Sequence, residues 1–137
     1  MKELIREKIL EVEEMKKQLE KTQLSIVYDF FKESSLKSID IDMEHEYNDE
    51  GGSYSIFNIT SINGHWLEES ISDGFLSDFG NDLPDWFCSF CLENNIKQTD
   101  IEIFCELFFE FLPEELQSTI SFNSLTAEKL KAMIDRN

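Results

Sequence analysis

Apolar residues recur at spacings of three and four over the first 35 residues of the chain. They form one stripe, Ile5, Ile9, Val12, Leu19, Ile26 and Phe30, with Met15 beside it. Glu and Lys fill most other positions, so the pattern predicts a single amphipathic helix from Lys2 to Ser35. Residues 24 to 31 hold more apolar bulk than the charged first half. We therefore expect the second half to pack in the core and the first half to protrude or to cover an edge.

The pattern changes to strict alternation between Ser38 and Tyr47. The apolar or aromatic set Ile39, Ile41, Met43, His45 and Tyr47 alternates with Asp40, Asp42, Glu44 and Glu46. Successive side chains of a strand point to opposite faces, so this segment is predicted to be a half-buried β-strand. His45 belongs to the apolar set, and we expect it to be a core histidine with one hydrogen-bonded nitrogen.

Two further strands are predicted directly after the first. Asn48 to Gly52 has turn composition, and residues 54 to 62 are typical of a second strand. Asn63-Gly64 is the preferred two-residue turn of type I′, and His65 begins a third strand. Residues 36 to 67 are thus expected to form a three-stranded antiparallel meander, followed by an irregular acidic connection over residues 68 to 82.

Helical signals dominate residues 83 to 137. Asp82 is placed to cap a helix that ends near Asn95, with Pro84 in its first turn. Thr99-x-x-Glu102 has the form of a capping box, and Pro113 would end a helix over residues 100 to 112. The same residues alternate well enough to form a strand, and this alternative stays open. Shorter helices are expected after Pro113 and over residues 126 to 134.

Together these elements predict one α+β domain over residues 1 to 137. We expect a long N-terminal helix (1–35), a three-stranded antiparallel sheet (36–67), an acidic connection (68–82) and a mainly helical half (83–137) that packs on one sheet face. A length of 137 residues is close to the usual size of a single domain with its own core.

The net charge of −17 belongs to the middle of the chain. Residues 36 to 122 contain 19 Asp and Glu against only Lys37 and Lys97, whereas residues 1–35 sum to −1 and residues 123–137 to +1. A surface of one sign destabilises its own folded state by self-repulsion, and it suits a partner of opposite charge. We therefore expect a basic protein partner, and no direct binding to nucleic acid or to membrane surfaces, which are themselves negative.

The expected compartment is the cytoplasm. No apolar run approaches 18 residues, and the N-terminus lacks the apolar segment of a signal peptide. Three cysteines, an odd number without framework spacing, are typical of reduced thiols. Cys88 and Cys91 match C-x-x-C, but their neighbours Trp86, Phe87 and Phe90 are typical of a core helix, so we expect buried structural cysteines. Zinc binding and redox chemistry remain weaker alternatives.

Four carboxylates on the first strand give the sharpest local signal. Asp40, Asp42, Glu44 and Glu46 would lie about 6.7 Å apart in a line about 20 Å long, without interleaved Lys or Arg. Such a line can occupy a basic groove that otherwise binds phosphates. The alternatives are a solvated sheet face and a Mg²⁺ or Ca²⁺ site. A nuclease-type metal site would also need a Lys or His that converges on the carboxylates, and Lys37 is the only cation nearby in sequence. We therefore predict no metal centre, and the sequence gives no sign of a cofactor.

Two further groups of residues are candidates for partner binding. Glu102, Glu106 and Glu110 would form an acidic stripe on the predicted helix, and Trp66, Phe75 and Phe79 are possible interface anchors among acids. No phosphate-binding loop, nucleophile elbow or H-E-x-x-H motif occurs, so the sequence predicts no enzyme. The full set of candidate partner-binding residues is Asp40, Asp42, Glu44, Glu46, Asp49, Glu50, Trp66, Glu68, Glu69, Asp73, Phe75, Asp78, Phe79, Asp82, Glu102, Glu106 and Glu110.

In size, acidity and lack of catalytic motifs the chain resembles two groups of inhibitors. One comprises immunity proteins that neutralise nuclease toxins, and the other comprises nucleic-acid mimics by which phages and plasmids block restriction or CRISPR systems. The resemblance rests on the general character of residues 36–122, such as the alternating acids of residues 39–47. It implies a non-enzymatic inhibitor of a basic nucleic-acid-handling protein, with toxin immunity favoured. An adaptor that forms a homodimer through residues 2–35 is the second alternative.

Overall fold

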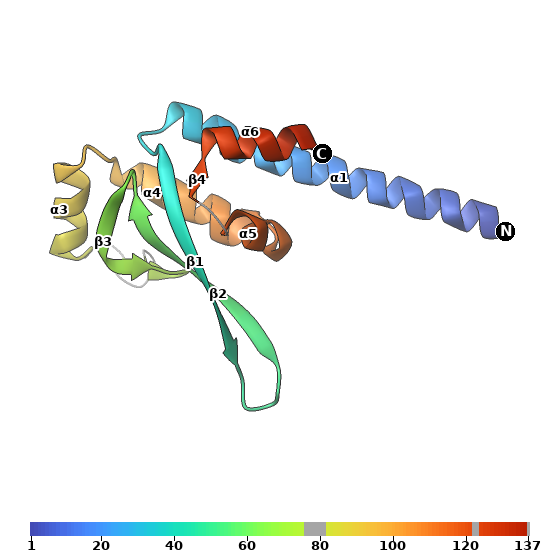
Figure 1. The fold of residues 1–137 in the computed structure, drawn as a ribbon, viewed down its shortest axis with the longest axis horizontal. Coiled ribbons are helices and arrows are strands. Elements are labelled where there is room, and N and C mark those ends of the chain that lie inside the picture. The colour runs from blue at the N-terminus through green and yellow to red at the C-terminus, as the bar shows by residue number, and fades with distance from the viewer. Residues whose placement is uncertain (76–81, 122–123, 137) are drawn as a thin grey trace.

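A computed structural model describes residues 1–75, 82–121 and 124–136 of the chain (Figure 1). A long helix, α1 (Lys2–Glu33), is followed by an antiparallel sheet and then by a helical C-terminal half. The α+β architecture predicted from the sequence is therefore confirmed.

The sheet has four strands in the order β3-β2-β1-β4. Strands β1 (Ser38–Tyr47), β2 (Ser53–Ile62) and β3 (His65–Ile71) form the predicted meander. The sequence did not indicate β4 (Leu125–Thr126), which pairs with the start of β1, because two residues are too short to show an alternation. Strand β3 extends to Ile71, so the connection expected from residue 68 begins only at Ser72.

The turn between β2 and β3 matches its sequence signal. Asn63 and Gly64 have φ angles of 55° and 80°, as a type I′ turn between β2 and β3 requires. The Asn63 side chain also accepts hydrogen bonds from the backbone N–H groups of Lys37 and Ser38, at 2.6 and 3.1 Å. This turn therefore also holds the start of β1 in place.

The C-terminal half is helical, and residues 100–112 do not form a strand. Helix α4 (Gln98–Cys105) continues directly into a π-helical segment, η1 (Glu106–Phe111). The other helices are α3 (Asp85–Glu93), α5 (Glu114–Ile120) and α6 (Ala127–Arg136). The buried residues Ile101, Phe104 and Phe108 follow one another at spacings of three and four, which is the helical period. Ile103 and Phe111, which a strand would place on the same face as Ile101, are exposed.

Two predicted helix caps are wrong. Helix α3 has Pro84 at its N-cap and no side-chain cap, so Asp82 lies outside the helix. Helix α4 begins at Gln98, which places Thr99 inside the first turn rather than at the cap. In place of a capping box, the Asp100 carboxylate accepts hydrogen bonds from Ser35 N–H and Oγ, at 2.8 and 2.6 Å. A tertiary contact with the end of α1 has replaced the local motif.

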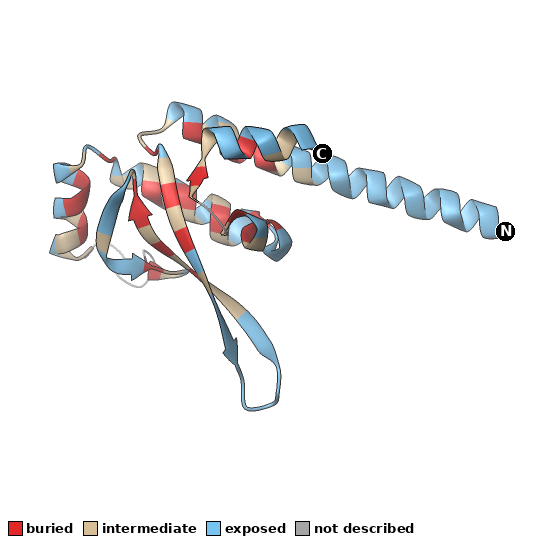
Figure 2. Ribbon diagram, viewed as in Figure 1, coloured by how far each residue is buried: buried red, intermediate tan, exposed pale blue. Residues whose placement is uncertain are grey.

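The core lies where the sheet, α1 and the C-terminal helices meet (Figure 2). Phe57 of β2 packs edge-on against Phe108 of η1 with ring centroids 5.7 Å apart, so η1 covers the inner face of the sheet. The second half of α1 packs in the core, as expected, but it does so through Leu24, Val27 and Phe31. Of the stripe predicted from the sequence, Ile26 is 42% exposed and Phe30 is only half-buried. The first half of α1 and the far end of the β1–β2 hairpin extend away from this core and are exposed.

None of the helices in the described residues combines the length and the apolar character needed to cross a membrane.

Candidate functional site

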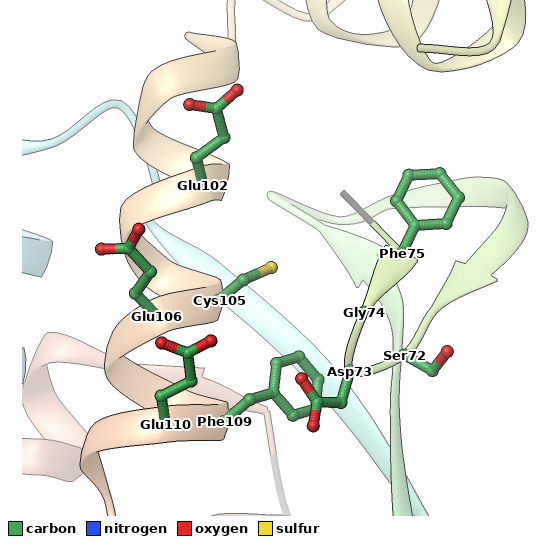
Figure 3. Close-up of a pocket in the computed structure, with 9 residues that line it drawn as sticks. All are labelled: Ser72, Asp73, Gly74, Phe75, Glu102, Cys105, Glu106, Phe109 and Glu110. Atoms are coloured by element: carbon green, nitrogen blue, oxygen red, sulfur yellow. The ribbon is translucent and has the colours of Figure 1, made fainter. Parts of the chain in front are cut away.

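A hollow of about 290 Å³ lies between the α4–η1 helix and the segment that follows β3 (Figure 3). Glu102, Glu106 and Glu110 follow one another along the helix wall, as their spacing of four residues predicted. Asp73 lies on the opposite wall, and the side chains of Cys105 and Phe109 point toward it from the helix. Ser72, Gly74 and Phe75 complete the lining.

A second hollow of about 540 Å³ continues the first toward the base of the β1–β2 hairpin. It shares Ser72, Asp73 and Phe109 with the first hollow. Its other lining residues come from β2 and α5: Tyr54, Ser55, Ile56, Phe57, Glu114 and Gln117. We call the two hollows together the acidic groove. It joins α4, η1 and α5 to the edge of the sheet.

The groove is strongly negative. Its lining contains the carboxylates of Asp73, Glu102, Glu106, Glu110 and Glu114, and no Lys, Arg or His is among these described lining residues. All five carboxylate residues are exposed at the rim. Burial raises the pKa of the Cys105 thiol to about 12, and the nearby charges of Asp73, Glu102 and Glu106 add to this effect. The field that these carboxylates create inside a concave site therefore disfavours a further negative charge.

This arrangement suits the side chain of Arg or Lys. Phe109, half-buried between the two walls, offers an apolar and aromatic surface for the aliphatic part of such a side chain. Carboxylates on both walls can accept the charge-assisted hydrogen bonds of a guanidinium or ammonium group. The Cys105 thiol stays protonated at neutral pH, since its pKa is about 12, so it supplies no nucleophile.

Asp40 lies on the same face of β1 as Asp42, Glu44 and Glu46, as predicted, but its carboxylate is hydrogen-bonded within the protein. Its two oxygens accept short hydrogen bonds from the hydroxyls of Ser61 on β2 and Ser124 beside β4. These bonds lower the pKa of the Asp40 carboxyl. Asp40 therefore joins β1 and β2 to the segment before β4, and each of its oxygens is engaged in a hydrogen bond within the protein.

The remaining row, Asp42, Glu44 and Glu46, is exposed on the outer face of β1 as predicted. Tyr54 on β2 donates a hydrogen bond of 2.9 Å to Glu46, and this bond raises the pKa of the Tyr54 phenol. Trp66 pairs with Ser61, which pairs with Asp40, so its side chain shares this outer face. With 76% of its surface exposed, Trp66 remains a candidate anchor.

Several other candidates take different positions. Phe75 is buried against Trp86 and Phe87, with ring centroids 5.9 and 5.7 Å away, so it is a core residue rather than an exposed anchor. Asp78 and Phe79 lie outside the described residues. Four others are exposed but line neither hollow, Asp49 and Glu50 in the hairpin turn and Glu68 and Glu69 on β3. Asp82 is exposed before α3.

His45 is not in the core, where the sequence predicted it, and several residues of the groove were not among the sequence candidates. His45 is exposed near the hairpin end, where its Nδ1 lies 3.4 Å from Ser55 Oγ, because the hairpin extends beyond the core. Glu114, Tyr54 and Phe109 line the groove but were not among the candidates. Of these three, only Glu114 could have been recognised from the sequence, because it is an acid directly after Pro113, the residue expected to end the preceding helix.

The three cysteines are free thiols. Cys91 is buried in α3, and its burial raises its pKa to about 11. Cys88 and Cys91 lie inside one helix, as the sequence predicted, and not at a helix start where a redox motif would activate its thiol. Among the described residues, no three His, Cys, Asp or Glu side chains are grouped in a way that could hold a metal ion.

Comparison with models of known protein families, with curated proteins and with solved structures gave no match.

Proposed function

We propose that this protein is a non-enzymatic inhibitor that binds a basic, nucleic-acid-handling protein through the acidic groove. The preferred target is a nuclease toxin, which would make the protein an immunity protein. The observation that carries this proposal is the lining of the groove, which places five carboxylates around half-buried Phe109 without a basic side chain among the described lining residues.

A protein that handles nucleic acid must present Lys and Arg along the path of the phosphates. A loop or strand that carries such side chains can insert them between Asp73 and the glutamates of the helix wall. The inhibitor would then occupy residues that the target needs for its own substrate. Association of this kind is fast because of electrostatic steering, and it weakens as salt rises. The free cysteines fit a reducing compartment such as the cytoplasm, where an immunity protein would protect its own cell.

A nucleic-acid mimic directed against restriction or CRISPR proteins is the second candidate, and a different observation favours it. Asp42, Glu44 and Glu46 form an exposed row about 13 Å long on β1, and none of the three lines the groove. A mimic would bind its target through this line of charge on β1, whereas an immunity protein would bind through the groove around Phe109.

The proposal is tested with a purified nuclease toxin domain from the genomic neighbourhood of the coding sequence, and with an arginine-rich peptide as a simpler probe. We expect the triple variant Glu102→Gln, Glu106→Gln, Glu110→Gln to bind either probe at least about tenfold more weakly, with a shallower salt dependence. The assay measures both the Kd between 50 and 300 mM NaCl and the inhibition of nuclease activity.

A matched control is available on α1. Glu3, Glu7 and Glu14 are exposed helical glutamates far from the groove, and their replacement by Gln changes the net charge by the same amount. This control should bind nearly as the wild type does. Equal losses of affinity in both triple variants would show that net charge alone matters. That result would contradict the proposed role of the groove. Loss only on neutralising Asp42, Glu44 and Glu46 would favour the mimic.

A further inference from the structure

The first half of α1 is not covered by any other described part of the chain. Residues 1–19 are all exposed, and at 1.5 Å per residue they extend about 28 Å away from the core (Figure 2). Isolated helices of this length are marginally stable in water, and most helices in proteins depend on the burial of an apolar face. Here that face is present in the sequence but uncovered.

The exposed apolar residues follow a heptad pattern. Ile5, Val12, Leu19 and Ile26 recur every seven residues, and each keeps 42–57% of its surface exposed. Met1 and Met15, also exposed, fall at the second repeating position of the heptad, three residues after the first. Lys8 and Thr22 occupy the same position in the other two heptads, so the seam, which is the line of contact between the two helices, is interrupted twice by polar side chains, and this lowers the stability of a pair. Lys16 and Gln23 interrupt the apolar stripe when Ile9 is placed at its centre. In the register defined by Ile5, Val12, Leu19 and Ile26, both residues flank the seam.

Charge favours a second copy of the same segment over a basic protein. Residues 1–19 contain five basic and five acidic side chains and so sum to zero, whereas the remaining residues carry the whole charge of −17. A basic partner would be attracted to the body rather than to this segment. Two copies of a neutral helix meet without net repulsion between the segments themselves.

The flanking residues indicate a parallel pair. In the register defined by Ile5 and Val12, Glu11 lies five residues before Lys16, the spacing at which the flanking positions of two parallel helices face each other. Each Glu11 would thus face Lys16 of the other copy. The equivalent pair one heptad earlier, Leu4 with Ile9, adds apolar contact.

We infer that the exposed half of α1 pairs in parallel with the same segment of a second copy of this chain. Closing the seam would bury on the order of 1,000 Å² over the two copies, at the lower limit of stable interfaces. The dimer is accordingly a weak one. The acidic bodies repel each other, so association strengthens as added salt screens them, opposite to the salt dependence expected for binding a basic target.

The test is sedimentation equilibrium of the full-length protein between 10 and 200 µM, at 50 and 300 mM NaCl. We expect a monomer–dimer equilibrium, and Leu19→Glu should raise its Kd at least about tenfold because it introduces a charge into the seam. Leu10→Glu is the matched control. Leu10 is 63% exposed and lies nine residues before Leu19, on the opposite side of the helix, so its replacement should leave the Kd unchanged.

The orientation is tested by reversing charges. Glu11→Lys should weaken the dimer, and adding Lys16→Glu to it should restore part of the affinity. Circular dichroism of each variant monitors the helix content. A protein that is monomeric throughout this concentration range, or a Leu10→Glu effect as large as that of Leu19→Glu, would overturn the inference. Failure of either kind leaves the groove proposal unaffected, since its probes and variants involve other residues.

Discussion

Replacement of Asp40 by Ala removes a carboxylate that joins strands β1 and β2 to the segment before β4. Both of its oxygens accept hydrogen bonds from serine hydroxyls, Ser61 Oγ and Ser124 Oγ. Ser61 is only 2% exposed, so water cannot replace the lost acceptor without a change in the surrounding structure. Asp42, two residues later on the same face, is exposed, and no hydrogen bond to its carboxylate occurs within the described residues.

The expected loss follows from these contacts. A buried hydroxyl left without a partner costs about 1–3 kcal/mol, and the half-buried Ser124 contributes about 0.5–1.5 kcal/mol. Removal of one negative charge from an acidic surface returns a few tenths of a kcal/mol. We therefore expect Asp40→Ala to lower the free energy of unfolding by about 2–3 kcal/mol. Asp42→Ala should change it by less than about 0.5 kcal/mol.

Urea unfolding followed by circular dichroism at pH 7 measures this difference. At a slope of about 2 kcal/mol per molar urea, the midpoint of Asp40→Ala should fall by about 1 M relative to the wild type. Asp42→Ala serves as the control for a change of charge on the same strand and the same face.

The pH dependence gives an independent check. The pKa of Asp40 is lowered in the folded protein, so its contribution is present above the unfolded value of about 3.9 and is lost as the pH falls through the folded value. The difference between wild type and Asp40→Ala should thus be largest near neutral pH and shrink below about pH 4. Equal stabilities of the Asp40→Ala and Asp42→Ala variants at pH 7 would refute the structural role of Asp40.

Two further predictions concern the core and the thiols. Phe108→Ala should lower the free energy of unfolding, measured in urea, by about 3–5 kcal/mol, because the buried ring of Phe108 packs against Phe57 and Phe104. The control Phe111→Ala changes an exposed position and should lower it by under about 1 kcal/mol. Similar losses in the two variants would contradict the packing described. The pKa values of Cys91 and Cys105 are about 11 and 12, so few of these thiols are ionised at pH 8. Both should therefore react with iodoacetamide much more slowly in the folded protein than in urea, as followed by mass spectrometry. Equal rates in the two states would refute their burial.

The acidic groove shows how far a local pattern extends. The spacing of Glu102, Glu106 and Glu110 was enough to predict a stripe on one helix. The sequence placed Asp73 in a separate acidic connection, and only packing sets it against that stripe across the hollow. Phe109 and Tyr54 resembled ordinary core and strand residues, because their types and spacing carry no sign of the concave surface that they line.

The carboxylate row on β1 shows where a local pattern misleads. Alternation correctly placed Asp40, Asp42, Glu44 and Glu46 on one face of a strand. It could not show that Ser124, which is 84 positions away, lies beside Asp40 in the fold and donates a hydrogen bond to its carboxylate. The same limit explains His45, whose apolar register is correct but whose part of the hairpin extends past the core.

The sequence by itself determined the period of each segment, the positions of the main turns and the charge of the body, since these depend on neighbouring residues and on composition. The tertiary structure decided which acids meet, which of them is already hydrogen-bonded, and which apolar stripe the described part of the chain leaves uncovered. Those outcomes depend on contacts between residues far apart in sequence, and such contacts are set by how the helices and the sheet pack around one core.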